Sequence, residues 1–390
     1  MTSSPVTELD LIGGDFALIR DAVRGALHVE PAADGISVSR LPEWTRAQYG
    51  DDPMIGRASS EGSGVRLVFT TKASWIELEM TFTRVSLEWL GFPARPAAVT
   101  VTAGGAHEES AFFEEGHILQ IQPGQPPATI QGAPTFVRFE LPPVDADQTI
   151  EVWLPHNCSV RLHRLRADSE LRPGPRTDPR WIHYGSSISQ ASEAETPLGV
   201  WSVIAARELR LDLLNLGLGG SAQLDPFTAR SIRDEPAALI TLKLGINVVN
   251  GATFRKRTFG PAVHGFLDTI REGQPETPIV VMAPIFCPAH EETPGPTMVE
   301  NATARGSDIP RRPNDGQLTL VEIRKILGSI VESRSTNDPN IYFLDGLHLF
   351  GADDAKHLPD DLHPDAAGYE LMGKRFVAIA SSEPWLPASS

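Results

Sequence analysis

The chain changes character near residue 170, and this change constrains its fold more than any other feature of the sequence. Before it, short segments that alternate apolar and polar residues are separated by Gly, Pro, Asn and Asp, as in strands joined by turns. After it, apolar runs of strand length alternate with segments of helical periodicity. A polar segment with three prolines, residues 167–179, separates the two parts. The sequence therefore predicts a β-rich domain at residues 1–170 and an α/β domain at residues 171–390.

The first part contains several segments that favour strands. They are Val65–Thr71, Trp75–Phe82, Ala98–Thr102, Phe136–Leu141, Ile150–Leu154 and Val160–Leu165. Many short strands at this spacing are typical of an all-β sandwich of jelly-roll-like type. No long helical period occurs before residue 165, and only residues 10–26 favour a helical turn or two.

Strands and helices alternate in the second part. Strands are expected at Trp181–Tyr184, Leu211–Leu216, Ala238–Leu244, Pro278–Ala283 and Ile341–Leu344, and helices at Val200–Leu209, Pro261–Arg271, Leu318–Arg334 and Ala366–Ala380. This alternation predicts a mainly parallel sheet in a three-layer α/β/α sandwich of flavodoxin-like type. The long segment 285–317, rich in Pro and Gly, is expected to be a lid or a substrate wall, or else disordered.

Charge and composition narrow the classes of partner. The chain has 34 basic and 50 acidic residues and a net charge of −16, so it repels phosphate backbones and no nucleic-acid partner is expected. The sequence shows no apolar run of membrane-spanning length and no basic start followed by an apolar run, so neither a membrane span nor a signal peptide is predicted. Two cysteines make no disulfide framework. We expect a cytoplasmic protein and leave its oligomeric state open.

Polar residues and glycines follow the expected strands at the edge of the sheet where ligands bind. Ser187 follows the first strand, Gly220 lies in the glycine-rich turn after the second, and Asn247 follows the third. Asp360 and His363 come just before the last helix. A serine nucleophile, two potential oxyanion donors, and a base with its orienting carboxylate are therefore expected at one edge.

Together these segments resemble the sequence blocks of the SGNH (GDSL-type) hydrolase family. Gly185-Ser186-Ser187 is similar to the family's Gly-Asp-Ser block, and the turn that contains Gly220 to its second block. Gly245-Ile246-Asn247 matches Gly-x-Asn, and Asp360, His363 and Pro364 match Asp-x-x-His-Pro. The order of the blocks agrees across residues 185–364. The first domain resembles the accessory β domain of some two-domain carbohydrate esterases of this family, without a shared motif.

The resemblance implies a serine esterase that works through an acyl-enzyme and needs neither a metal nor another cofactor. Ser187 would attack the ester carbonyl, His363 would take its proton, and Asp360 would hold the imidazole in the required tautomer. The backbone N–H groups of Ser187 and Gly220 and the side-chain amide of Asn247 would form the oxyanion hole. By analogy with two-domain relatives, the substrate would be a small acyl ester, above all an acetyl ester, of a sugar or other polyol.

Ser186 departs from the family pattern, which has Asp at this position. That Asp is not the triad acid, so the substitution is expected to change hydrogen bonding in the loop rather than to abolish activity. Three alternatives remain open: an acyltransferase with the same triad, a lipid or metabolite carboxylesterase, and a non-catalytic carbohydrate-binding protein.

Two local patterns invite other interpretations. Residues 217–222 imitate a dinucleotide fingerprint, but the next strand leads into Gly245 rather than an acidic residue, so an oxyanion turn explains these glycines better. Residues 353–363 contain several Asp and His residues of the types that bind metals, and a solvated loop beside the triad is the preferred interpretation. His183 is expected to be a buried structural histidine, and Cys287 to be inert.

Overall fold

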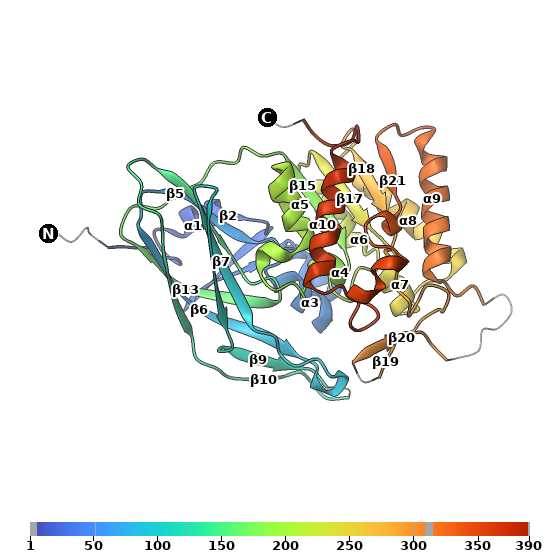
Figure 1. The fold of residues 1–390 in the computed structure, drawn as a ribbon, viewed down its shortest axis with the longest axis horizontal. Helices are drawn as coiled ribbons and strands as arrows, with labels where there is room; N and C mark the ends of the chain where they lie inside the picture. Colours follow the sequence, from blue (N-terminus) through green and yellow to red (C-terminus); the bar gives the residue numbers. More distant parts are fainter. Residues whose placement is uncertain (1–5, 51, 123, 301, 309–314, 389–390) are drawn as a thin grey trace. The chain divides into compact units, whose positions relative to one another are not determined.

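The structure is a computed structural model that describes residues 6–388 except 51, 123, 301 and 309–314 (Figure 1). It consists of two compact units. The first, the β unit, comprises residues 1–43, 59–177 and 195–198, and the second, the α/β unit, comprises residues 44–58, 178–194 and 199–390. The chain passes from the first unit to the second at residues 177–178, and it also crosses between them at 43–44, 58–59, 194–195 and 198–199. Strand β14 (Arg172–Pro173) pairs with β5 (Arg66–Thr71) and so keeps the residues just after 170 in the β unit.

Two mostly antiparallel sheets form the β unit. Within the described residues, the larger sheet has the order β10-β9-β6-β13-β4-β3, with β1 on β13 and β11 on β6. The smaller sheet has the order β14-β5-β12-β7-β8, with β2 on β5. The larger sheet contains β1 (Thr7–Glu8), β3 (His28–Ala32), β4 (Gly35–Ser39), β6 (Trp75–Ser86), β9 (His117–Gln120), β10 (Ala128–Ile130), β11 (Thr135–Glu140) and β13 (Cys158–Ala167). The smaller sheet adds β2 (Val23–Arg24), β7 (Ala97–Ala103), β8 (His107–Phe113) and β12 (Gln148–Trp153).

The two sheets bury their facing side chains in one core. Strand β11 alternates buried and exposed residues along its length, and its Val137 and Phe139 point inward. They join Phe69 of the smaller sheet and Leu78 of the larger sheet in the same hydrophobic cluster. Burying a side chain of this size contributes about 1.5–3 kcal/mol, so the period-two pattern specifies which face of each strand is inside. The expected β-sandwich is confirmed. Helix α1 (Phe16–Ala22) supplies the helical turns expected near residues 10–26.

The α/β unit contains a parallel sheet flanked by helices. Its strand order within the described residues is β16-β15-β17-β18-β21, the order of flavodoxin-like folds. These strands are β15 (Arg180–Gly185), β16 (Asp212–Gly217), β17 (Leu239–Lys243), β18 (Ile279–Met282) and β21 (Ile341–Leu344). The predicted fold class is confirmed for this unit too. Every residue of β16, β17 and β18 is buried, as expected for strands covered on both faces.

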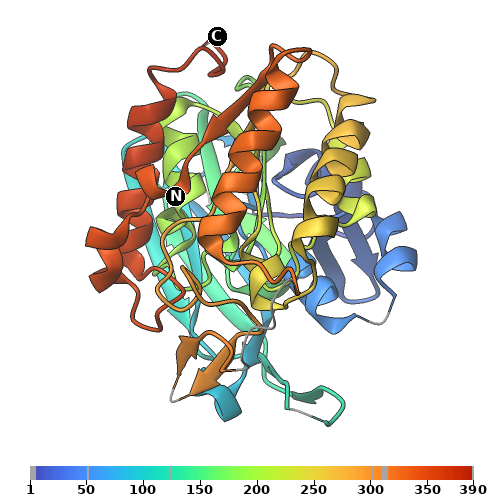
Figure 2. The same cartoon turned by 90° about the vertical axis from the view of Figure 1, so that its right-hand side faces the viewer.

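The helices divide between the two faces of this sheet. Helices α5 (Trp201–Leu209) and α10 (Ala366–Ala380) pack side by side on one face. Right-handed crossovers place α6 (Pro226–Asp234), α8 (Lys256–Arg271) and α9 (Leu320–Ser335) on the other. Figure 2 shows α10 in red on one side of the sheet and α8 in yellow on the other. The ring of Trp181 on β15 stacks on Phe376 of α10, with centroids 5.1 Å apart, and so holds α10 against the sheet.

Helix α8 begins five residues earlier than expected: it starts at Lys256, whereas Pro261 was the expected first residue. Proline favours the first helical turn because it lacks an N–H group. Here Pro261 lies inside the helix, and the Thr258 hydroxyl accepts a hydrogen bond from the Arg255 N–H at 3.1 Å, which fixes the true start.

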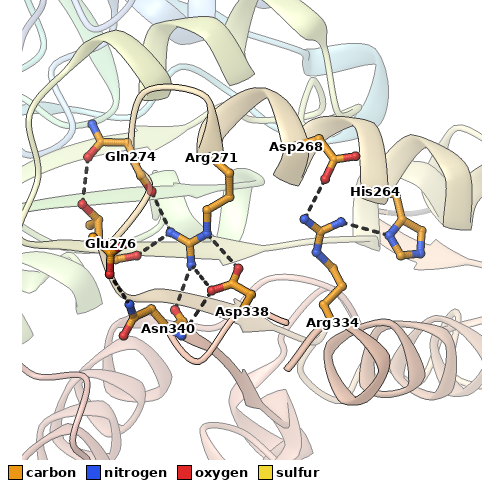
Figure 3. Close-up of polar contacts among 9 residues, drawn as sticks. His264, Asp268, Arg271, Gln274, Glu276, Arg334, Asp338 and Asn340 are labelled. Atoms are coloured by element: carbon orange, nitrogen blue, oxygen red, sulfur yellow. Dashed lines mark hydrogen bonds and ion pairs between the residues drawn. The ribbon is translucent and has the colours of Figure 1, made fainter. Parts of the chain in front are cut away.

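A polar cluster holds the amino-terminal edge of the parallel sheet (Figure 3). Arg271 at the end of α8 donates to both carboxylate oxygens of Asp338, at 2.8 and 3.1 Å, just before β21. The same guanidinium also donates to the carbonyl oxygens of Gln274, Thr277 and Asn340. Arg334 of α9 donates to Asp268 of α8 at 2.7 Å. These contacts connect α8, α9 and β21 at the end of the sheet opposite the carboxyl ends of the strands.

The helices of the described chain are all too short or too polar to cross a bilayer.

Candidate active site

Ser187, His363 and Asp360 lie together beyond the carboxyl ends of the parallel strands. Ser187 Oγ is 2.9 Å from His363 Nε2, and His363 Nδ1 is 2.7 Å from Asp360 Oδ2. The other carboxylate oxygen of Asp360 accepts hydrogen bonds from the backbone N–H groups of Leu362 and His363, at 3.0 and 2.6 Å. The structure thus brings the three predicted residues into one hydrogen-bonded chain, which we call the serine cluster.

The surroundings of Asp360 favour its charged form. Burial raises the pKa of this carboxyl, but the hydrogen bonds and charge of His363 and the backbone N–H groups outweigh burial and hold the pKa below its usual range. An ionised Asp360 accepts a hydrogen bond from a protonated His363 Nδ1, which leaves Nε2 as the acceptor for the Ser187 hydroxyl. The tautomer is assigned from these partners. This chain of donors and acceptors is the one that a serine nucleophile requires.

The local sequence positions Ser187 at the start of a short helix. Strand β15 ends at Gly185, where a Cβ atom would lie 2.1 Å from Ser189 Oγ, so only glycine fits. Ser186 caps α4 (Ser187–Gln190), and its side chain accepts a hydrogen bond from the Ile188 N–H at 3.3 Å. The hydroxyl of Ser186 therefore performs the capping for which a carboxylate is also suited. The Ser187 N–H, at the first helical position, has no acceptor within the helix.

The turn after β16 is held against α4 by two side-chain amides. Asn215 Oδ1 accepts the Gly217 N–H at 2.9 Å, and its Nδ2 donates to the Ser189 carbonyl at 2.8 Å. Gln190 Oε1 accepts the Gly219 N–H at 2.9 Å. Gly220 has a φ of +75°, a left-handed conformation that glycine adopts without strain. These contacts fix the backbone of the predicted oxyanion turn next to Ser187.

Asn247 lies on α7 (Ile246–Asn250), directly after β17. Gly245 precedes it with a φ of +110°, and a Cβ there would lie 2.4 Å from Ile323. Asn247 Oδ1 accepts the Ala222 N–H at 3.1 Å, which orients the amide and keeps Nδ2 as its donor. The third predicted loop is therefore connected to the second, and the second to α4.

The described part of the long segment 285–317 is attached to the same loops. Its hairpin, β19 (Met298–Glu300) and β20 (Thr303–Arg305), donates the Ala304 N–H to the Asp360 carbonyl at 2.8 Å. The Thr297 N–H reaches the Asn250 carbonyl at the end of α7, also at 2.8 Å. Residues 301 and 309–314 of this segment lie outside the described residues. The described part of the segment thus borders the serine cluster and α7, a position suited to a substrate wall.

Two other residues considered in the sequence, His183 and Cys287, are buried in surroundings that indicate a structural role. His183 is fully buried and contacts Thr241 Oγ1 at 2.7 Å and Ser189 Oγ at 2.8 Å. Burial and the nearby Lys243 lower its pKa to about 3, so it stays neutral. Cys287 is also buried, which raises the pKa of its thiol to about 12, and its Sγ donates to the Asp361 carbonyl at 3.2 Å. Neither residue is poised for acid–base or nucleophilic chemistry.

Asp and His side chains of residues 353–363 take part in separate pairs rather than in one cluster. Asp354 contacts Arg375 at 3.1 Å, His357 Nδ1 contacts Asp365 at 3.2 Å, and Asp360 contacts His363. Among the residues that the structure describes, no three His, Cys, Asp or Glu side chains are grouped as metal ligands.

One segment beside the predicted oxyanion turn could not be identified from the sequence pattern. Residues 44–58, far from the α/β domain in sequence, belong to the α/β unit and form α2 (Arg46–Tyr49) and the first part of α3 (Pro53–Ser60). Arg57 and Met54 of α3 lie beside Gly219 and Gly220 of the oxyanion turn. Short helices within a β-rich half carry no motif, so only the folded chain identifies these neighbours.

Comparison with known proteins agrees with this geometry. Residues 183–371 match the GDSL-like lipase/acylhydrolase family. Among solved structures, a salicylyl-acyltransferase from a tetracycline biosynthetic pathway is 25% identical, with a TM-score of 0.76 and coverage of 94% of this chain and 96% of that one. No curated protein matches the sequence.

Two further structures are similar in fold. A putative GDSL-like lipase from Bacteroides ovatus is 16% identical, with a TM-score of 0.65 and coverage of 97% of both chains. A family two carbohydrate esterase from Clostridium thermocellum is 14% identical, with a TM-score of 0.58 and coverage of 93% of this chain and 100% of that one. The family match spans the predicted serine, glycine, asparagine and Asp-x-x-His blocks, and the similar folds extend over both units. The protein is an SGNH-type hydrolase, with a domain of the GDSL-like lipase/acylhydrolase family joined to an N-terminal β-sandwich.

Proposed function

We propose that the protein is a serine esterase that hydrolyses small acyl esters, above all acetyl esters, of a sugar or other polyol. The observation that carries this proposal is the serine cluster, in which Ser187 Oγ lies 2.9 Å from His363 Nε2 and Asp360 holds the opposite imidazole nitrogen. Such a hydrogen-bonded series of hydroxyl, imidazole and carboxylate activates serine for attack on a carbonyl.

The reaction proceeds through an acyl-enzyme. His363 Nε2 takes the hydroxyl proton as Ser187 Oγ bonds to the ester carbonyl carbon, and the Asp360 carboxylate stabilises the resulting imidazolium. His363 then gives this proton to the departing alkoxide, which leaves as the alcohol. A water molecule repeats the sequence: His363 takes its proton, the hydroxide oxygen attacks the acyl carbon, and Ser187 leaves with the proton returned to its Oγ.

The oxyanion that forms in each step needs preorganised donors. The Ser187 and Gly220 N–H groups and Asn247 Nδ2 are proposed to supply them. The hydrogen bonds from Gly219 to Gln190 and from Ala222 to Asn247 support this assignment, because they fix the donors before substrate binds. Removal of one such donor typically lowers the rate by about 10²- to 10³-fold.

The alcohol part of the substrate is inferred from fold similarity. The two-domain carbohydrate esterases share this chain's fold over nearly their whole length, and such likeness supports a sugar or polyol ester as the substrate class. A cytoplasmic site of action is also proposed, and it favours small glycosides or metabolites over polymers.

An acyltransferase is the second candidate. It is favoured by the similarity to the salicylyl-acyltransferase over 94% of this chain. The two activities share the acyl-enzyme and differ only in whether water or a second hydroxyl attacks it. Product analysis with an added acceptor alcohol separates them: a transferase forms a new ester, whereas an esterase releases the free acid.

The test of the esterase proposal is the turnover of p-nitrophenyl acetate, butyrate and octanoate by the wild type and by Ser187→Ala. We expect turnover that falls with acyl length and that disappears in the variant, which also controls for contaminating esterases. A preference for octanoate would indicate a lipid or metabolite carboxylesterase instead. A folded wild type without Ser187-dependent turnover or acyl transfer would point to a binding protein and contradict the proposal.

A further inference from the structure

We propose that Arg57 binds a carboxylate on the acyl group of the substrate, so that, among acyl chains longer than acetyl, the enzyme prefers those that end in a negative charge. This inference rests on the proposed esterase function and specifies the substrate of the same site. It concerns the segment 44–58, which neither the family match at residues 183–371 nor the sequence motifs include.

Residues 44–58 are anchored to α6 of the α/β unit. The ring of Tyr49 lies 5.9 Å from that of Phe227, measured between centroids. The guanidinium of Arg230 stacks over Trp44 at 5.5 Å and donates to Gln48. These aromatic and polar contacts give the segment a defined place on the hydrolase domain.

Helix α3 continues from this anchored segment. Asp52 Oδ1 accepts the N–H groups of Met54 and Ile55, at 2.8 and 3.4 Å, at the helix start. Ile55 and Ala58 are buried. One face of α3 is therefore buried. Met54 and Arg57 are half-buried and lie on the side of the oxyanion turn.

Arg57 and the nucleophile border the same small space. A Cβ atom on Gly219 would lie 3.4 Å from Arg57 Nη2 and 3.6 Å from Ser187 Cβ. Residue 219 has no side chain, so nothing from this position separates the guanidinium from the serine. A Cβ on the neighbouring Gly220 would lie 3.7 Å from Met54 Cε. Arg57 thus lies within reach of a group of two or three carbons attached to Ser187.

The topology indicates which part of the ester Arg57 meets. His363 comes from the loop before α10, which packs with α5 on one face of the sheet. The segment with Arg57 is anchored to α6, on the other face. The alcohol must lie near His363, because His363 protonates it as it leaves. The acyl chain therefore extends along the opposite flank, where Arg57 lies.

A guanidinium at this position selects for charge. Its planar set of N–H donors matches a carboxylate, and charge-assisted hydrogen bonds are roughly twice as strong as neutral ones. Arg57 is half-buried, so salt screens its interactions less than those of a surface arginine. An acyl chain with a terminal carboxylate gains this contact, and an apolar chain of the same length does not.

The test compares two esters of ethanol with four-carbon acyl chains, monoethyl succinate and ethyl butyrate, which differ in a terminal carboxylate or methyl group. Ethanol release is followed by NMR for the wild type, Arg57→Gln and Arg57→Lys. Arg46→Gln is the matched control, because Arg46 is exposed on the preceding helix and the substitution removes the same charge.

We expect the wild type and Arg46→Gln to prefer the succinate ester in kcat/KM by about 10- to 100-fold, the range for a hydrogen bond between charged groups. Arg57→Gln should lose this preference through a higher KM for monoethyl succinate, with ethyl butyrate turnover retained. Arg57→Lys should restore part of it, which a purely structural role of Arg57 would not predict.

Three outcomes would overturn the proposal. A wild type that hydrolyses both esters through Ser187 but prefers the butyrate contradicts it and leaves the esterase function intact. So does an Arg57→Gln variant, shown to be folded by its thermal unfolding, that loses both activities equally. The absence of Ser187-dependent turnover of either ester would overturn the proposed function and this inference together.

Discussion

Three buried titratable side chains near Ser187 differ in how their surroundings change their pKa and therefore their charge. Asp360 keeps its charge because hydrogen bonds to it exceed the effect of burial, whereas His183 stays neutral because its pKa falls to about 3. Lys243 is fully buried at the end of β17, and burial, followed by the charge of Arg324, lowers its pKa to about 7. Asp360 is proposed to serve the chemistry of the site, and His183 and Lys243 belong to the scaffold beneath it.

The role of Asp360 predicts a large effect from an isosteric change. Asp360→Asn should lower kcat/KM by about 10³- to 10⁴-fold, because a side-chain amide can donate to His363 Nδ1 and so favour the wrong imidazole tautomer. The measurement is p-nitrophenyl acetate hydrolysis at fixed pH. Asp361→Asn is the control, since its left-handed φ of +61° is one that Asn tolerates. Equal losses in both variants would contradict the assigned role of Asp360.

Burial of Lys243 predicts a pH-dependent effect on stability. Its Nζ has no hydrogen-bond partner within the described residues, so Lys243→Met should stabilise the fold at pH 7 by about 1–3 kcal/mol, the usual cost of an unsatisfied buried polar group. The folded pKa lies below the unfolded value, so the unfolded state binds more protons between them. The stability of the wild type relative to the variant should therefore rise with pH from about 7 to about 10. Urea unfolding across this range tests it, and a pH-independent difference would contradict it.

Elements of the α/β unit were predictable where several independent signals agree. Strand β21 and helix α10 have their expected bounds, because a short apolar run marks the strand and the Asp365 cap marks the helix start. Helices α4 and α7 are too short to show a period, and Pro261 hid the start of α8. Strand β8 (His107–Phe113) was missed because its first four residues are polar and none of its residues is fully buried at the sheet edge. Short or edge elements derive their stability from neighbours rather than from their own pattern.

The Arg271 cluster predicts an effect on stability without an effect on catalysis. Arg271→Gln should lower the free energy of unfolding by about 1–3 kcal/mol, because it leaves the Asp338 carboxylate and three carbonyl groups short of donors. The cluster lies at the edge of the sheet opposite the serine cluster, so kcat per folded molecule should be unchanged. Arg257→Gln, an exposed position on the same helix, is the control. A stable variant, or one with reduced kcat, would contradict this account.

In the whole molecule, some residues that lie within the β-rich half of the sequence belong to the α/β unit. The serine, glycine, asparagine and Asp-x-x-His blocks could be placed from the sequence because parallel topology brings strand ends to one edge. The residues that border them could not: Arg57 comes from the β-rich half, yet it belongs to the α/β unit through contacts that no local pattern encodes. Motifs thus predicted the chemistry, and tertiary packing supplied the neighbours on which acyl selectivity is proposed to depend.

The central claim is that Ser187 is the nucleophile, activated by His363. The most direct measurement is the site and rate of covalent labelling of the folded protein by a fluorophosphonate, followed by mass spectrometry of its peptides. We predict a single adduct on Ser187, absent in Ser187→Ala and formed at least about 10³-fold more slowly in His363→Ala, in which the general base is missing. A folded wild type that stays unlabelled, an adduct on another serine, or labelling of His363→Ala at the wild-type rate would contradict the account.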